Sequence, residues 1–323
     1  MMKKRIGFIV ILATIVLLAS GCTQAKDDLT ISTFKNSSKQ EKKDIWGPFS
    51  KKYDLTIKTE FGNDKERLEN SDAGIDVIEL LQKDAVTGNK EARFKKLDFS
   101  KLKNFGLLSK QQQKIAKETN SIPYQVKRLG VVYNSNKVGK IYSWDQLWDA
   151  GLESSVAVPN ITTELGPQML YMVQGHYQRK QVTSVFVDTG QLDSKTMFME
   201  LSNLKPNILK VYDDPNGLSQ MLKSGEIYVA VVDDITGQKI QKANPNIKFV
   251  FPKEDDYIGY KTAAILKNSK SDKDYQYLDF LIEKNQNNLK QVDRLQMLRK
   301  IDYEFLNKHL TSYTKEWNKI INR

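Results

Sequence analysis

Two neighbouring carboxylates, Asp233 and Asp234, are the clearest candidates for binding a charged group. They follow the near-continuous apolar run 226–232, which is typical of a central strand in a parallel sheet. Open α/β sheets bind ligands at the carboxyl ends of their strands, so the pair could face a cleft and hold a cationic group. The alternative is a solvated turn in which an aspartate caps the segment 235–237. Both hypotheses stay open at this point.

Patterns typical of catalysis or of metal binding are sparse. His176 and His309 are the only histidines, and we expect both to be surface or packing residues because they lie in unrelated helical contexts. The sequence contains no nucleophile elbow, P-loop, zinc-protease helix or dinucleotide fingerprint. Carboxylates are plentiful but no catalytic pair stands out, so a hydrolase with paired acids is a distant third hypothesis. We therefore expect a binding protein that is not an enzyme and holds no metal or cofactor.

The N-terminal residues predict export. Basic residues 3–5 precede the apolar run 6–18, which is too short to span a bilayer comfortably and ends in small residues. The run leads into Leu18-Ala19-Ser20-Gly21-Cys22, which resembles the lipobox of bacterial lipoproteins. This resemblance implies cleavage before Cys22 and a lipid on its thiol, which would tether the protein to the outer face of the cytoplasmic membrane. The alternative is an ordinary signal peptide followed by a chance cysteine.

Charge and cysteine content narrow the class of protein further. The chain has 323 residues and a formal net charge of +11, which falls to +8 when the basic residues 3–5 leave with the signal peptide. Lysines are spread along the whole length, which indicates a solvated surface facing an anionic envelope. We expect no nucleic-acid binding, because there is no basic stripe with aromatic platforms. With a single cysteine the chain has no disulfide, and its length suffices for a core that most simply forms two lobes.

Alternating strand and helix patterns predict an α/β fold with mostly parallel strands. The helix that follows Ser143 has a capping box with Gln146, and Gly151 is expected to close it. A turn at residues 159–164 offers a Thr or an Asn to cap the next helix. The expected strands are 29–34, 55–61, 75–80, 129–133, 155–158, 226–232 and 262–266, and further helices are expected at 39–52 and around 275–282.

An ordered series of fragments resembles one protein family, the substrate-binding proteins of spermidine/putrescine importers, which belong to the two-lobed solute receptors. Each fragment alone is weak, but together they keep the same order and similar spacing from about residue 29 to residue 284. The matching stretches are Ile75-Asp76-Val77-Ile78, residues 96–105, Ser121-Ile122-Pro123-Tyr124, residues 130–134, residues 143–148, Leu204-Lys205-Pro206-Asn207, Gly225-Glu226-Ile227 and Phe251-Pro252-Lys253-Glu254.

This resemblance implies a type II periplasmic-binding-protein fold. Each of its lobes would be a mostly parallel sheet flanked by helices, and crossing strands would join the lobes around a ligand cleft. The expected organisation is a signal peptide at 1–21, a lipidated tether at 22–27, lobe 1 at 28–128 and 260–300, lobe 2 at 129–259, and C-terminal helices at 301–323 that pack on the lobes. The implied partners are a membrane permease and its cytoplasmic ATPase, and we expect the receptor itself to be a monomer.

The residues at the family's ligand positions depart from the family's usual pattern. Polyamine receptors clamp ammonium groups with carboxylates and stack the methylene chain between aromatic rings. Here Phe34 keeps a ring and Glu164 keeps a carboxylate, whereas Lys261 stands where the family has an aspartate. The candidate ligand-binding residues carried over in this way are Phe34, Lys35, Asn36, Gln82, Lys127, Arg128, Asn160, Thr163, Glu164, Asp233, Asp234, Tyr260 and Lys261.

Both charge signs are therefore expected in the cleft. Lys127, Arg128 and Lys261 could bind an anionic group or neutralise the acidic residues, and Lys261 would repel an ammonium ion unless it pairs with Glu164, Asp233 or Asp234. We predict a receptor for a zwitterionic or partly anionic solute rather than for a polyamine. The main alternative is an envelope interaction or adhesion lipoprotein that keeps the fold without transport.

Overall fold

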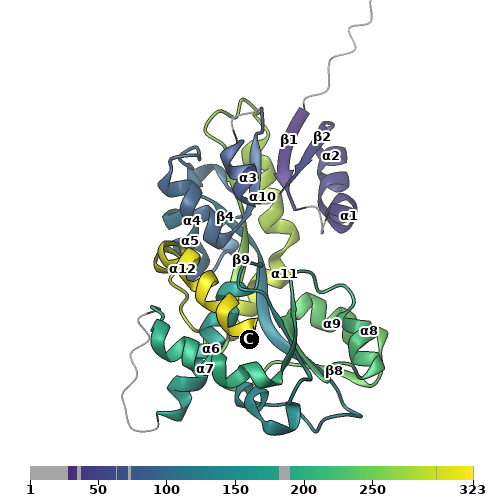
Figure 1. The fold of residues 1–323 in the computed structure, drawn as a ribbon. Helices are drawn as coiled ribbons and strands as arrows, with labels where there is room; N and C mark the ends of the chain where they lie inside the picture. The colour runs from purple at the N-terminus through teal and green to yellow at the C-terminus, as the bar shows by residue number, and fades with distance from the viewer. Residues whose placement is uncertain are drawn as a thin grey trace, which may run out of the picture.

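Two long strands, β4 (Ile122–Asn134) and β9 (Ile258–Ile265), connect the halves of the molecule. They lie side by side and antiparallel at the centre of a 9-stranded sheet with the order β2-β1-β3-β9-β4-β7-β5-β6, and β8 pairs with β4 outside this path. The first half of β4 pairs with β9, whereas its second half pairs with β7 and β8. In Figure 1 both strands run between an upper and a lower body, which we call lobe 1 and lobe 2.

The computed structural model describes residues 28–34, 38–62, 64–71, 74–181, 190–295 and 297–322. The predicted signal peptide, the tether with Cys22, and the candidate ligand residues Lys35 and Asn36 lie outside these ranges. Within them, no helix combines the length and apolar character needed to cross a membrane.

Lobe 1 is the body built on the N-terminal strands. Its core joins apolar residues of β1, β4 and β9 to those of α10, which comes much later in the chain. The parallel pairs β1–β2 and β1–β3 form its edge, and β3 pairs antiparallel with β9. Its strands are β1 (Asp28–Thr33), β2 (Thr56–Phe61) and β3 (Val77–Leu81), and its helices are α1 (Ser38–Glu41), the π-helix η2 (Lys42–Trp46), α2 (Gly47–Tyr53), α3 (Asp64–Glu69), α4 (Gln82–Lys90), η3 (Phe99–Lys101), η4 (Phe105–Leu107), α5 (Lys110–Thr119), α10 (Asp274–Lys284), α11 (Gln286–Leu289) and η8 (Lys290–Arg294).

Lobe 2 has a core of its own, centred on β5, β7 and α6 and closed by the C-terminal helix. Here β5 pairs in parallel with β6 and β7, and every residue of β7 is buried, as expected for a central strand. Its strands are β5 (Val156–Pro159), β6 (Ile208–Tyr212), β7 (Val229–Asp233) and β8 (Ile247–Val250), and its helices are η5 (Trp144–Trp148), η6 (Ala150–Leu152), α6 (Gly166–Lys180), α7 (Ser194–Leu204), η7 (Lys205–Asn207), α8 (Leu218–Ser224) and α9 (Asp234–Ala243).

The predicted α/β fold with two lobes is confirmed, with a refinement of the strand directions. Strands are parallel within each lobe but antiparallel wherever β4 or β9 takes part, so the sheet is mixed. The crossing strands cause this, because each must leave one lobe and enter the other. The capping box of Ser143 and Gln146 is present, although the helix is a 3-10 turn that ends at Trp148 rather than at Gly151.

The C-terminal helix α12 (Tyr303–Ile321) contacts both lobes. Its apolar face, including Leu306 and Trp317, belongs to the core of lobe 2. On the other side, the amide nitrogen of Asn307 donates to the backbone oxygen of Lys83, at 2.7 Å, and to the hydroxyl of Thr87, at 3.1 Å, both in α4 of lobe 1. Figure 1 shows this helix lying alongside the junction. The lobe boundaries at 128/129 and 259/260 stay a prediction.

Candidate functional site

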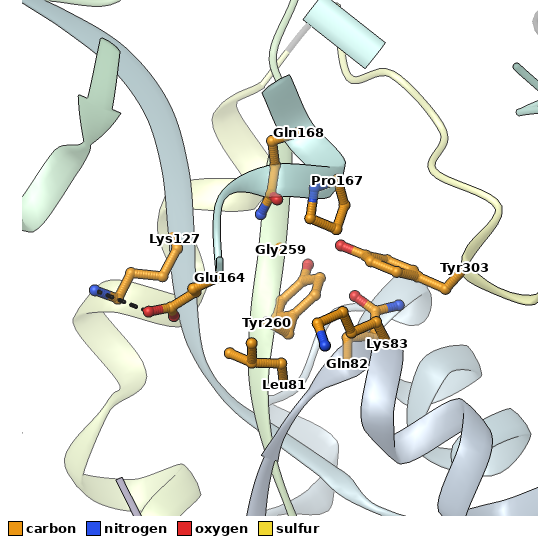
Figure 2. Close-up of a pocket in the computed structure, with 10 residues that line it drawn as sticks. All are labelled: Leu81, Gln82, Lys83, Lys127, Glu164, Pro167, Gln168, Gly259, Tyr260 and Tyr303. Carbon is orange, nitrogen blue, oxygen red and sulfur yellow. Dashed lines mark ion pairs between the residues drawn. The ribbon is translucent and has the colours of Figure 1, made fainter. Parts of the chain in front are cut away.

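A small cavity lies where the lobes and the crossing strands meet, and Figure 2 shows the residues around it. Its lining comes from the end of β3 and the start of α4, from the start of α6, from β4 and β9, and from the first residue of α12. The open space is about 10 Å³, enough for roughly one water molecule. The lining residues are Leu81, Gln82, Lys83, Lys127, Glu164, Pro167, Gln168, Gly259, Tyr260 and Tyr303.

Two helices begin at this cavity, one from each lobe. Helix α4 starts at Gln82, directly after the buried strand β3, and α6 starts at Gly166 with Pro167 in its first turn, where a missing N–H does no harm. Their N-cap residues are Leu81 and Leu165, and neither caps its helix with a side-chain hydrogen bond. The partial positive charge of both helix ends is therefore available to an anionic group between the lobes.

Lys127 brings a positive charge to the same place. Its Nζ lies 3.3 Å from Asp233 Oδ1 and 4.0 Å from Glu164 Oε2. Burial on its own would lower the pKa of Lys127, but the Glu164 and Asp233 carboxylates outweigh burial and raise that pKa above its ordinary value, so the side chain stays protonated. The ammonium of a crossing strand thus neutralises carboxylates of lobe 2.

Asp233 and Asp234 are buried at the junction of β7 and α9 rather than solvated. Asp233 is the N-cap of α9 and accepts hydrogen bonds from the backbone N–H of Thr236, at 3.0 Å, and from its hydroxyl, at 2.6 Å. Burial raises the pKa of Asp233, but Lys127 and the Thr236 hydrogen bonds overcome that effect and hold the pKa below its usual value. Asp234 accepts from the backbone N–H of Arg128 at 3.1 Å, and burial raises its pKa.

Gly259 lets α6 approach the crossing strands closely. A Cβ at this position would lie 2.1 Å from Gln168 Nε2 and 3.2 Å from the Tyr303 hydroxyl. In the amide orientation that satisfies both of its polar atoms, the Gln168 side chain donates to the backbone oxygen of Glu164 and accepts from the Gly259 N–H, each at 3.1 Å. Because Gly259 has no side chain, Gln168 can make these hydrogen bonds, and they hold the turn that carries Glu164 against β9.

Polar atoms remain unsatisfied around the cavity. Glu164 Oε1 is buried and has no hydrogen-bond partner among the described residues. The Tyr260 hydroxyl also has no hydrogen-bond partner among the described residues, and burial raises its pKa above the ordinary value. A carboxylate oxygen without a donor is costly to bury. A donor group on a bound solute would satisfy Glu164.

Phe34 and Lys261 meet in lobe 1 and do not line the cavity. The Lys261 Nζ lies 4.4 Å from the centroid of the Phe34 ring and 3.8 Å from Glu41 Oε1. Lys261 lies near Glu41 rather than near Glu164, Asp233 or Asp234, the partners considered from the sequence. The reason is topological, because Lys261 lies on β9 between Leu81 and Gln125 in register, and there its ammonium reaches Glu41 of lobe 1.

The remaining predicted residues have separate surroundings. Arg128 turns to Asp256, with Nε 2.7 Å from Oδ1, and its guanidinium lies 3.6 Å from the centroid of the Phe251 ring. Asn160 and Thr163 lie in the turn before α6, where the Thr163 hydroxyl donates to the Asn160 backbone oxygen at 2.7 Å. The prediction that a Thr or an Asn caps α6 is wrong, because the helix starts later, after Leu165. Gln82, Lys127, Glu164 and Tyr260 are the predicted residues that line the cavity.

Several lining residues were not predicted from the sequence. Gly259 had a detectable signal, since a glycine inside a strand pattern often marks a close approach of another segment. Tyr303 and Gln168 gave none, because each reaches the site through contacts far apart in the sequence. The unpredicted lining residues are Leu81, Lys83, Pro167, Gln168, Gly259 and Tyr303.

The histidines lie away from this cavity. His176 is buried, stacks on Trp148 at a centroid distance of 3.8 Å, and has Nδ1 2.8 Å from Asp145 Oδ1. Burial lowers the pKa of His176. Within the described ranges, no group of three or more His, Cys, Asp or Glu side chains is arranged to hold a metal ion.

Comparisons with known proteins agree on one family. The family model described as bacterial extracellular solute-binding protein matches residues 47–295. An ABC transporter protein from Clostridium perfringens ATCC 13124 has a similar structure, with 28% identity and a TM-score of 0.73, over 91% of this chain and 100% of that chain. None of the curated proteins matches in sequence.

More distant structures share the fold but were determined with different ligands. The spermidine/putrescine ABC transporter substrate-binding protein PotD of Streptococcus pneumoniae, in complex with calcium and HEPES, is 16% identical with a TM-score of 0.71, over 91% of this chain and 98% of that chain. The PBP MotA of Agrobacterium tumefaciens B6, in complex with glucopine, is 14% identical with a TM-score of 0.68, over 91% of this chain and 100% of that chain. The fold alone therefore does not select a ligand.

Proposed function

The chain belongs to the family of bacterial extracellular solute-binding proteins, and from this premise we propose that it is the receptor of an ATP-driven importer and captures a small solute between its lobes. Members of the family are exported receptors rather than enzymes, as the sequence predicted. The loaded receptor would dock on a membrane permease, and a cytoplasmic ATPase would drive the solute through it.

The observation that carries the proposal is the composition of the cavity lining. Residues of both lobes, both crossing strands and the C-terminal helix converge on one small space. A solute held there would contact every part of the fold that moves when the lobes close, so its binding energy would favour the closed form. The space of about 10 Å³ holds roughly one water molecule, so the lobes must separate to admit a solute.

We propose a zwitterionic or partly anionic solute. Its anionic group would lie between the uncapped starts of α4 and α6, near Lys83 and Lys127. Its donor group would reach the unsatisfied Oε1 of Glu164. Compared with the sequence-based hypothesis, Lys127 replaces Lys261 as the cation that faces the solute.

We propose that lipid on Cys22 holds the receptor at the outer face of the cytoplasmic membrane. The support is sequence-based: a basic start, a short apolar run and the sequence Leu18-Ala19-Ser20-Gly21-Cys22. One lipidated cysteine with its attached acyl chains would give stable anchoring without a membrane-spanning helix. A monomer at the surface suits delivery to a permease.

The test is a thermal-shift screen of the purified protein against amino acids, small organic acids, sugars, phosphonates and polyamines. A solute that binds only the folded state must raise the melting temperature. We expect hits among small zwitterions and acids, with loss of the shift in Glu164→Gln and Lys127→Met. A screen without hits, together with the absence of permease and ATPase genes beside this one, would favour the interaction lipoprotein instead.

A further inference from the structure

Lys261 places an ammonium group in the kind of environment that proteins use to bind a cationic ligand. Its Nζ lies over the Phe34 ring at 4.4 Å from the centroid and 3.8 Å from the Glu41 carboxylate. An aromatic face together with a carboxylate is a standard recognition site for an amine. In this protein the amine at that site is the side chain of Lys261.

The position of this ammonium is fixed by the sheet. Lys261 pairs with Leu81 of β3 on one side and with Gln125 of β4 on the other, so its backbone cannot shift without breaking two ladders. The residue is 5% exposed, and a charge buried to this extent is stabilised only by its partners. Lys261 therefore occupies its site permanently rather than transiently.

A second protein cation lies near the same ring. The Arg67 guanidinium carbon is 5.0 Å from the Phe34 centroid, and its Nη2 donates to the backbone oxygen of Glu79 at 2.8 Å. Arg67 is buried as well. An ammonium group of a solute that approached Phe34 would meet both positive charges at short range, and their repulsion would oppose its binding.

We propose that Lys261 is a built-in occupant of an ammonium site in lobe 1 and acts as a specificity-determining residue that excludes solutes with two cationic ends. This inference rests on the proposed receptor function, because the exclusion of a dicationic solute has a meaning only for a protein that binds solutes. The natural ligand then carries at most one cationic group, which meets Glu164, and it is short enough to leave the Phe34 site untouched.

The experiment removes the ammonium group of Lys261 by mutation and supplies a free ammonium compound in solution. Lys261→Ala removes three methylenes and the ammonium group, and these atoms correspond to propylammonium. We expect Lys261→Ala to melt several degrees below the wild type and to recover in proportion to added propylammonium chloride. Neutral 1-propanol and an equal concentration of sodium chloride should not restore it. The wild type and Lys270→Ala, which alters an exposed lysine, should show no specific shift.

Unselective recovery would overturn the proposal, that is, an equal effect of 1-propanol or an equal shift in the wild type. The absence of any rescue of Lys261→Ala would overturn it as well. Lys261→Met keeps most of the stem and loses the charge, so it should melt below the wild type and should not respond to propylammonium, because its stem still fills the site. If Lys261→Ala cannot be recovered folded, Lys261→Met decides alone, and a melting temperature equal to that of the wild type would refute the role of the ammonium.

The same variants separate this inference from the receptor function. Rescue by propylammonium needs no natural ligand, so its failure leaves the proposed function standing, and a solute screen without hits leaves the rescue result standing. As a further readout, 1,4-diaminobutane should bind Lys261→Ala at least about tenfold more tightly than the wild type, which corresponds to about 1.4 kcal/mol. Equal affinity for both proteins would contradict the exclusion of diamines.

Discussion

Lys127 on β4 lies directly opposite Gly259 on β9, and both residues line the cavity between the lobes. The long side chain neutralises carboxylates of lobe 2, while the missing side chain opposite it admits Gln168. Lys127 thus supplies a positive charge, and Gly259 leaves room for the Gln168 side chain. The charged group of the site therefore lies on one of the two crossing strands about which the lobes would move.

Gly259→Ala should weaken solute binding more than it lowers stability. The new Cβ would displace the buried Gln168 amide, which holds the turn of Glu164 against β9. We expect about a tenfold loss of affinity, measured calorimetrically with the solute found by the screen. Gly106→Ala is the matched control, because its Cβ would meet no atom within 4 Å. Equal losses in both variants would show that the close approach at Gly259 is irrelevant to binding.

The pH dependence of stability should reveal the charge of Asp233. Its pKa is lowered in the folded state, so its ionised form contributes stability above the unfolded pKa of about 3.9, and this contribution disappears as the pH falls through the folded pKa. Asp233→Asn keeps an oxygen that can cap α9 but removes the charge. We expect the variant to be less stable than the wild type at pH 7, with the difference shrinking below pH ~4.

Urea unfolding at a series of pH values measures this difference. Asp234 has a raised pKa and acts in the opposite direction, but it is present in both proteins and largely cancels from the comparison. Asp234→Asn serves as the control, because removing a charge whose pKa is raised should not destabilise the protein in the same way. A difference between the wild type and Asp233→Asn that is constant from pH 2 to pH 7 would argue against the Lys127 pairing.

Sequence patterns predicted well those strands whose position depends only on the burial of apolar residues. The apolar run that ends at Val232 became β7, and residues 130–134, one of the fragments that resemble solute receptors, lie in β4 as expected. The length of β4 was underestimated, since Gln125, Lys127 and Arg128 interrupt its apolar pattern. Pairing with β9 holds that polar half of the strand in place, and such pairing cannot be read from local periodicity.

The candidate site was predicted only in part, for a physical reason. Glu164 and Lys127 were identified through resemblance and lie together at the cavity. Tyr303 and Gln168 were missed because long-range packing brings α12 and α6 to β9. The partners considered for Lys261 from the sequence lie in lobe 2, whereas the register of β9 places its ammonium near Glu41. Charge composition was thus predictable, and the identity of each ion pair was not.

Binding of solute should make the molecule more compact. The cavity of about 10 Å³ is too small for a solute of several heavy atoms to enter without separation of the lobes. Small-angle scattering should give a larger radius of gyration for the free protein than for the saturated complex. A radius unchanged at saturation would point to a rigid interaction protein, whereas the Gly259→Ala variant should require more solute for the same change.

Cys22→Ala should release the protein from the membrane. The thiol is the only one in the chain, so no other residue can accept the diacylglyceryl group. We expect the wild type in the membrane fraction and the variant in the medium or the soluble fraction after cell fractionation. Ser20→Ala, which leaves the thiol in place and keeps a small residue, is the control. A variant that stays firmly membrane-bound would refute the lipoprotein hypothesis.

The charge of the preferred solute is the most discriminating prediction. Lys127 is held protonated by Glu164 and Asp233, and Lys261 occupies the aromatic site of lobe 1, so the second ammonium group of a diamine meets a protein cation at either place. A zwitterion instead places its carboxylate near Lys83, Lys127 and the starts of α4 and α6, and its ammonium near Glu164 Oε1.

Titration calorimetry with α,ω-diamines and ω-amino acids of equal chain length isolates this difference, since only one end group changes. We expect the amino acid of each pair to bind at least about tenfold more tightly. Tight binding of spermidine or 1,4-diaminobutane by the wild type would overturn the charge argument and restore polyamines as the ligand class. Glu164→Gln should weaken binding of the amino acids, because their ammonium group meets this carboxylate.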